Sequence, residues 1–251
     1  MFVPLWDHNQ LENVRFQWVT FGLILANCIV YLAFQAGFVV PVSDAVLVGL
    51  AVVPNELVPG FLSQQPSGGP VTAAIPERLT LLTYMFLHGN ILHLLGNMIF
   101  LWVFGDNVED AMGHIRFLFF YLLCGVFAGL VHALVAPASN IPMIGASGAV
   151  AGVIAAYLML HPNVRVWCLW FFRIPLRVSA GFALLVWIGL QVISAFFDQG
   201  GSTAWWAHIG GLIAGAVLIL FMRRPGVRLF DRATGLEPQP QRRDTPGRQE
   251  A

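Results

Sequence analysis

The feature that most limits what this chain can fold into is a set of long apolar stretches without a single charged residue. A helix needs about 20 apolar residues to cross a hydrocarbon core of about 30 Å, and six stretches reach or approach that length. They cover residues 18–40, 90–105, 117–136, 146–160, 178–197 and 204–222. Hydrophobic residues make up 57% of the chain and charged residues only 10%, whereas a soluble domain is about 25% charged. We therefore predict an all-α, polytopic membrane protein with six transmembrane helices.

The balance of charge excludes one large class of function. The 13 basic residues are all arginines, and 13 acidic residues cancel them, so no basic face is available for a nucleic acid. Cys28, Cys124 and Cys168 lie far apart in apolar runs, without the spacing of a metal site or a disulfide framework. We interpret them as residues that pack between helices, and we expect neither a metal nor a cofactor.

The arginines also predict the orientation of the chain, because cytoplasmic loops collect basic residues. With the N-terminus inside, 12 of the 13 arginines are cytoplasmic and only Arg78 is outside. This divides the chain into a cytoplasmic segment (1–17), a membrane domain (18–222) and a disordered cytoplasmic tail (223–251), since the tail is rich in Pro, Gln and Arg. The first apolar stretch lacks the features of a cleaved signal peptide. We expect a bacterial inner membrane protein with both termini in the cytoplasm.

The loop of residues 41–87 is unusually apolar for a segment that faces water. The run 46–53 is too short to cross a bilayer and is followed by Pro54. Residues 77–87 can form a short helix on the outer leaflet. We predict that the whole loop lies in the membrane interface.

Four polar residues fall within the predicted spans, where polar groups are costly and therefore need a reason. They are His93, Asn97, Ser147 and His208. The 15 residues of 146–160 rise only about 22 Å, so the outer end of this helix should lie below the membrane surface, with Ser147 at that end. His93 and His208 each lie about one turn into a helix that also begins on the outer side. Three helices thus bring polar groups to a similar depth.

Glycine spacing predicts which of these helices touch. Gly148 and Gly152 in one span, and Gly211 and Gly215 in another, form the GxxxG pattern that lets helix backbones approach closely in lipid. Close packing of the two spans would bring the Ser147 hydroxyl towards the His208 imidazole, as a serine nucleophile and its base require. Backbone amides at the start of the helix, with donors from His93 and Asn97, could then hold an oxyanion.

At these residues the sequence resembles the rhomboid family of intramembrane serine proteases. The similarity rests on residues 88–97 (HGNILHLLGN), on residues 145–148 (GASG), and on Ala207-His208 followed by Gly211 and Gly215. With six spans in the expected order, it covers about residues 15–223.

The resemblance implies a catalytic dyad of Ser147 and His208 without an acid. It also implies an oxyanion hole formed by His93, Asn97 and the Ser147 amide, and cleavage of membrane-anchored proteins, such as single-span substrates, near the outer face. Supporting roles fall to residues that share the motifs: His88, Gly145, Gly148, Gly211 and Gly215.

The resemblance further implies that residues 178–197 and the loop 198–203, with Gly200 and Gly201, act as a lateral gate and cap. Residues 105–110 (GDNVED) are expected to have a structural role. One difference from many relatives is that residues 41–77 contain neither Trp nor Arg. This leaves open how the loop is anchored in the interface.

Other interpretations remain. Taken alone, a membrane serine or histidine is more often a packing or hydrogen-bonding residue. A non-catalytic rhomboid-like protein that binds clients is the main alternative to a protease, and a transporter is a third. We interpret Asn27, His132, His161 and Gln191 as structural, because none falls in a motif or pairs with a predicted partner, and Asp198 as a loop charge.

Overall fold

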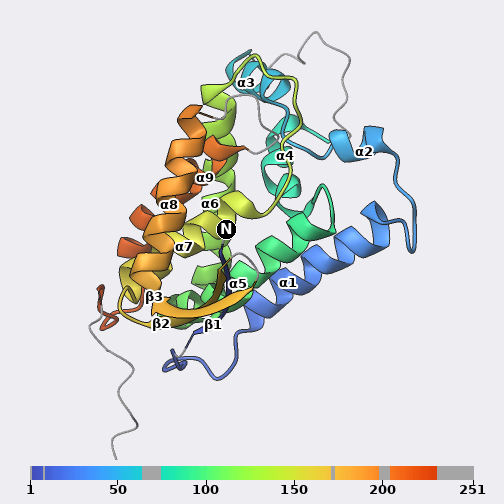
Figure 1. Ribbon diagram of the computed structural model, residues 1–251. Coiled ribbons are helices and arrows are strands. Elements are labelled where there is room, and N and C mark those ends of the chain that lie inside the picture. The colour runs from blue at the N-terminus through green and yellow to red at the C-terminus, as the bar shows by residue number, and fades with distance from the viewer. Residues whose placement is uncertain (1, 8, 64–74, 171–172, 198–203, 231–251) are drawn as a thin grey trace, which may run out of the picture.

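A computed structural model describes residues 2–7, 9–63, 75–170, 173–197 and 204–230. Figure 1 shows a helical bundle with a small sheet at one end and short connecting helices at the other. The elements in chain order are β1 (Phe2–Asp7), α1 (Trp18–Val30) continued by the π-helical turn η1 (Tyr31–Gln35), α2 (Asp44–Val48), α3 (Pro54–Ser63), α4 (Glu77–Thr83) continued by the 3₁₀ turn η2 (Tyr84–Phe86), α5 (Ile91–Met112), α6 (His114–Val135), α7 (Ser147–Leu160), β2 (Arg165–Trp170), β3 (Ile174–Ser179), α8 (Ala180–Phe197) and α9 (Trp205–Met222).

Five of the described helices are long and apolar enough to cross a membrane. They are Trp18–Gln35, α5, α6, α8 and α9. The remaining predicted span, residues 146–160, corresponds to α7, whose 14 residues rise only about 21 Å. The chain is therefore a mostly helical, multi-pass integral membrane protein, and the membrane crossing by α7 stays a prediction.

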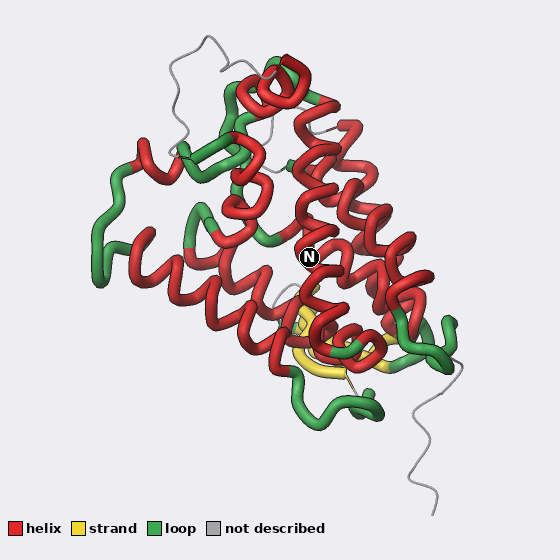
Figure 2. Tube along the Cα trace, turned by 180° about the vertical axis from the view of Figure 1, so that it is seen from behind, coloured by secondary structure: helices red, strands yellow, loops and turns green. Residues whose placement is uncertain are grey.

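Helix α7 lies inside the bundle, whereas α1 and α8 form opposite flanks (Figures 1 and 2). Eleven of the 14 residues of α7 are buried. By contrast, α8 exposes large apolar side chains such as Leu185, Ile193 and Phe197. An apolar outer face suits a helix whose solvent is lipid, because lipid tails cover such side chains without cost.

Two helix ends differ from the sequence-based prediction. The first helix ends at Gln35 rather than at residue 40, shortly before Gly37 takes a φ of +72°. The second continues to Met112 rather than stopping at Gly105, and it ends where Gly113 has a φ of +84°. The extension was unexpected because its polar residues look like a helix end, yet they are buried and hydrogen-bonded.

The polar motif at residues 105–110 has the structural role that we expected. The Asp110 carboxylate accepts hydrogen bonds from the backbone N–H of Glu12, Asn13 and Val14, and from the Asn13 side chain. The neighbouring Glu109 carboxylate accepts bonds from three donors at the start of α1, namely the backbone N–H of Val19 and Thr20 and the Thr20 hydroxyl. The bonds to Glu109 satisfy backbone amides in the first turn of α1, which have no acceptor within that helix.

A three-stranded antiparallel sheet, with strand order β1-β2-β3, is absent from the sequence-based prediction. It brings the N-terminal segment alongside β2, with Pro4 opposite Cys168. The Asp7 carboxylate, at the end of β1, accepts hydrogen bonds from Tyr157 Oη at 2.5 Å and from Asn107 Nδ2 at 3.3 Å. Burial raises the pKa of Asp7 to about 6. The N-terminal strand is thus joined to α5 and α7 through one buried acid.

The remaining segments connect to the bundle through backbone hydrogen bonds. Loop residue Val52 exchanges two such bonds with Met143, which lies just before α7. After α9, the Arg224 N–H donates to the Ala111 carbonyl and the Phe230 N–H to the Met159 carbonyl, so residues 223–230 of the predicted tail follow the bundle. The rest of that tail, 231–251, and the predicted cap loop, 198–203, lie outside the described residues.

Candidate active site

Ser147 is the first residue of α7, and the turn before it contains Gly145, whose backbone conformation suits glycine. Gly145 has a φ of +124°, a conformation that L side chains rarely adopt. Its N–H donates to the Tyr84 carbonyl at 2.9 Å, which fixes the loop against η2. Ser147 is half-buried, and its backbone amide belongs to the first turn of a helix, where amides lack intrahelical acceptors. The serine is therefore presented beside free donors.

Helices α7 and α9 touch through the two glycine pairs that the sequence predicted. A Cβ built on Gly215 would lie 2.5 Å from Gly152 Cα, and one built on Gly211 would lie 2.9 Å from the Gly148 carbonyl carbon. Both clearances are too small for any side chain. The same contact brings Gly148 next to Ala207, whose carbonyl oxygen is 3.6 Å from a Cβ at that glycine. The residues that follow Ser147 and precede His208 thus lie side by side.

The His208 ring is buried, with 7% of the residue exposed, between α8 and its own helix. Trp187 of α8 stacks against it at a centroid distance of 6.1 Å, and Trp205 meets it edge-on at 5.7 Å. Its Nδ1 atom is 2.8 Å from Oε1 of Gln191, also on α8. The interpretation of Gln191 as having no site partner is therefore wrong. The signal in the sequence was a polar amide within the otherwise apolar span of residues 178–197, where such a group needs a hydrogen-bond partner.

His93 lies at the start of α5 and its ring reaches the turn before Ser147. The Asn90 side chain caps this helix by accepting from the His93 N–H at 2.9 Å. His93 Nδ1 accepts from the Gly89 N–H at 3.4 Å, so in the neutral ring the proton is on Nε2. A Cβ on Gly145 would lie 2.8 Å from that Nε2 and 3.8 Å from Ser147 Oγ. The His93 Nε2–H group and the Ser147 hydroxyl therefore both lie next to Gly145.

Asn97 lies one turn beyond His93 and is buried. Its side-chain amide donates to the His93 carbonyl at 3.2 Å, within its own helix. This bond occupies one of its two N–H donors and leaves the second for another acceptor.

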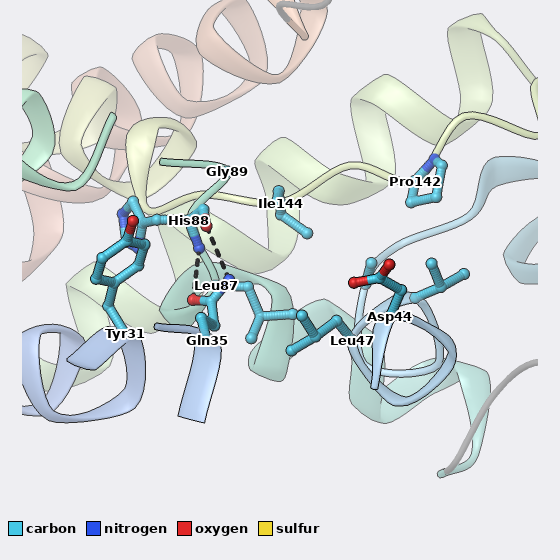
Figure 3. A pocket seen from close by; sticks show the side chains of 11 residues that line it. Tyr31, Gln35, Asp44, Leu47, Leu87, His88, Gly89, Pro142 and Ile144 are labelled. Carbon is cyan, nitrogen blue, oxygen red and sulfur yellow. Dashed lines mark hydrogen bonds between the residues drawn. The ribbon is translucent and has the colours of Figure 1, made fainter. Parts of the chain in front are cut away.

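His88 is 1% exposed, and its ring meets that of His93 at a centroid distance of 5.1 Å. Burial, reinforced by the neighbouring His93, lowers the pKa of His88 to about 4, so the ring is neutral at pH 7. Its backbone exchanges hydrogen bonds of 2.8 and 2.9 Å with the Gln35 side chain (Figure 3). His88 is therefore a buried neighbour of His93.

A cavity of about 310 Å³ is lined by His88 together with Tyr31, Gln35, Asp44 and Ile144 (Figure 3). The four polar residues of the candidate site do not line it. The cavity therefore borders the candidate site without containing its chemistry.

The other polar residues assigned to structure lie on α1, on α6 and directly after α7. The Asn27 amide donates to the Leu23 carbonyl within α1 at 2.8 Å. His132 is partly buried in α6, and His161 follows α7 and packs edge-on against Tyr157. All three cysteines are free thiols. Within the described ranges, no three His, Cys, Asp or Glu side chains are grouped as metal ligands.

Together, the fold and these residues define a multi-pass membrane protein in which a helix-start serine and a buried histidine lie on two tightly packed helices. Residues 76–225 match the sequence model of the Rhomboid domain family. RHOMBOID-like protein 4 of Arabidopsis thaliana is 30% identical over 188 residues, which cover 73% of this chain and 45% of that protein. The rhomboid protease GluP of Bacillus subtilis (strain 168) is 32% identical over 135 residues, covering 54% of this chain and 24% of that protein.

This chain belongs to the rhomboid family. RHOMBOID-like protein 5 of Arabidopsis thaliana is also similar, with 31% identity over 149 residues that cover 59% of this chain and 45% of that protein. The chain thus spans a little under half the length of the curated plant relatives.

Proposed function

We propose that this protein is an intramembrane serine endopeptidase that cleaves membrane-anchored proteins near the outer membrane face, with Ser147 as nucleophile and His208 as base. The observation that carries the proposal is the packing of α7 on α9 through glycines, which brings the helix start at Ser147 beside the turn that holds His208. GluP, a similar protein named as a rhomboid protease, supports the same activity.

In this mechanism His208 takes the Ser147 proton as Ser147 Oγ attacks the substrate carbonyl, and the tetrahedral oxyanion forms beside Gly145. The Ser147 amide, His93 Nε2–H and the second Asn97 N–H are the donors that would stabilise it. His208 then gives its proton to the leaving amine. Water from the outer side hydrolyses the acyl-enzyme with His208 again as base.

Because His208 must be neutral to accept a proton, cleavage should decline at acid pH, and cleavage that persists once the His208 ring is protonated would contradict its role. We further propose that residues 18–222 form the membrane domain, with 1–17 and 223–251 in the cytoplasm of a bacterial cell and 41–87 in the outer interface. Helix α8 and the loop after it would form the gate through which a substrate helix enters.

The test is cleavage of a single-span substrate, with small residues near its outer end, in proteoliposomes. Wild type, Ser147→Ala and His208→Ala are compared with Ser43→Ala, which removes an exposed interfacial hydroxyl that caps nothing. The proposal expects cleavage by wild type and Ser43→Ala only. Equal cleavage by all four would refute it. Substrate binding without cleavage by the folded wild type would favour the client-binding alternative.

A further inference from the structure

The hydrogen bond between His208 Nδ1 and Gln191 Oε1 determines which tautomer His208 adopts. An amide oxygen can only accept a hydrogen bond, so Nδ1 must donate and therefore carries the ring proton. Nε2 is then left with a lone pair, and a neutral ring of this kind is the form that can take a proton from a hydroxyl. The geometry at Gln191 thus selects the base form of the imidazole.

Gln191 and Trp187 are one turn apart on α8 and act on the same ring. Trp187 stacks against the His208 imidazole while Gln191 bonds to its edge. Together they restrict both the tilt of the ring and its rotation. A buried amide in a membrane helix is costly compared with a leucine unless its polar atoms are satisfied, and Gln191 is only 7% exposed. Its partner here is the candidate base itself.

A neutral acceptor also fits the electrostatics around His208. Among the described residues, the titratable side chains that act on this ring are His93 of α5 and His132 of α6. A carboxylate at position 191 would favour the protonated imidazole, which cannot act as a base. Glutamine supplies the acceptor without that charge.

We propose that Gln191 is a positioning residue that fixes His208 in the Nδ1–H tautomer and holds its ring for proton transfer from Ser147. This inference rests on the proposed protease function. It gives α8 a second task, because the helix that forms the proposed gate also orients the base from the side. Moving α8 away from α9 would release the His208 ring.

The test compares Gln191→Leu, which removes the acceptor at similar volume, with Gln191→Glu, which keeps an acceptor and adds charge. Asn27→Leu is the matched control, because it removes a buried amide that bonds within α1. For each full-length variant, kcat and KM are measured in proteoliposomes over a pH range that extends far enough below neutrality to include the acid limb of the wild type. Nitrogen-15 NMR of histidine-labelled protein assigns the His208 tautomer, and thermal unfolding reports the fold.

For Gln191→Leu we expect kcat to fall by about tenfold or more at unchanged KM, since general acid–base catalysis contributes about 10²- to 10⁴-fold to the rate. The Nδ1–H signal of His208 should be present in wild type and weakened in this variant. Gln191→Glu should recover most of the kcat, with the acid limb of its profile moved up by about one pH unit or more. Asn27→Leu should leave kcat, tautomer and pH profile unchanged.

The proposal is overturned if Gln191→Leu keeps kcat within twofold of wild type, or if Gln191→Glu shows the wild-type acid limb. A Gln191→Leu protein that is less stable but keeps the wild-type His208 tautomer would also overturn the proposal. If Gln191→Leu does not fold, Gln191→Glu still tests the role. Failure of the protease function is a separate result, because wild type itself would then not cleave. The NMR measurement still reports the tautomer in that case.

Discussion

The contact between α7 and α9 gives the sharpest quantitative prediction, through Gly215→Ala. A Cβ at this position would lie 2.5 Å from Gly152 Cα and closer still to the Gly152 carbonyl oxygen, whereas ordinary contact begins at 3.4 Å, so the helices must separate by at least about 0.9 Å. Neighbouring backbone, unlike a flexible side chain, cannot move aside locally. A misplacement of about 1 Å between reacting groups can cost about 100-fold in rate. We therefore expect kcat to fall by about that factor although Gly215 lies two turns from His208.

The assay is cleavage of the single-span substrate, with thermal unfolding of the same preparations. Overpacking should also lower the free energy of unfolding by about 1–3 kcal/mol. Gly22→Ala is the matched control, because a Cβ there meets nothing within 4 Å, and it should behave as wild type. If Gly215→Ala is folded and cleaves within twofold of wild type, close packing of these helices does not set the distance between Ser147 and His208.

Three further outcomes follow from single contacts. Because the pKa of Asp7 is about 6 when folded and 3.8 ordinarily, the free energy of unfolding should fall by up to about 3 kcal/mol as pH rises from 4 to 6. Asp7→Asn should remove the part of this dependence that Asp7 contributes, and parallel pH curves for the two proteins would contradict it. Asp110→Ala leaves three backbone amides without their acceptor, so the free energy of unfolding should fall by about 2–4 kcal/mol. The kcat of the folded protein should stay unchanged, and an unaltered melting temperature would argue against this. Gly145→Ala combines a strained φ with a clash against the His93 ring at 2.8 Å, so kcat should drop by about tenfold or more, and wild-type kcat would rule out the assigned place of His93.

The helices and their closest contacts could be predicted because their signals are local in sequence. Runs without charge locate the spans, and glycines at a spacing of four identify the faces that touch, as Gly148 and Gly211 illustrate. Asn90 marks the start of α5 by the same kind of local rule, since its side chain caps the helix.

Features that depend on distant pairing could not be predicted. The sheet joins residues 2–7 to residues 165–170, and neither segment shows its partner in its own sequence. The helix extension past Gly105 depends on acceptors at Glu109 and Asp110 that serve residues 12–20. Gln191 is the most instructive case, because its partner His208 lies on another helix and only the packing of α8 against α9 brings them together.

The central claim is that Ser147 is a nucleophile activated by His208, and active-site phosphonylation tests it most directly. A fluorophosphonate forms a bond from serine Oγ to phosphorus with loss of fluoride, and it requires the activated hydroxyl rather than any particular substrate. Mass spectrometry of the folded protein should locate the adduct at Ser147, absent in Ser147→Ala and strongly reduced in His208→Ala. Folded wild type that forms no adduct at Ser147, or forms it equally well in His208→Ala, would contradict the claim.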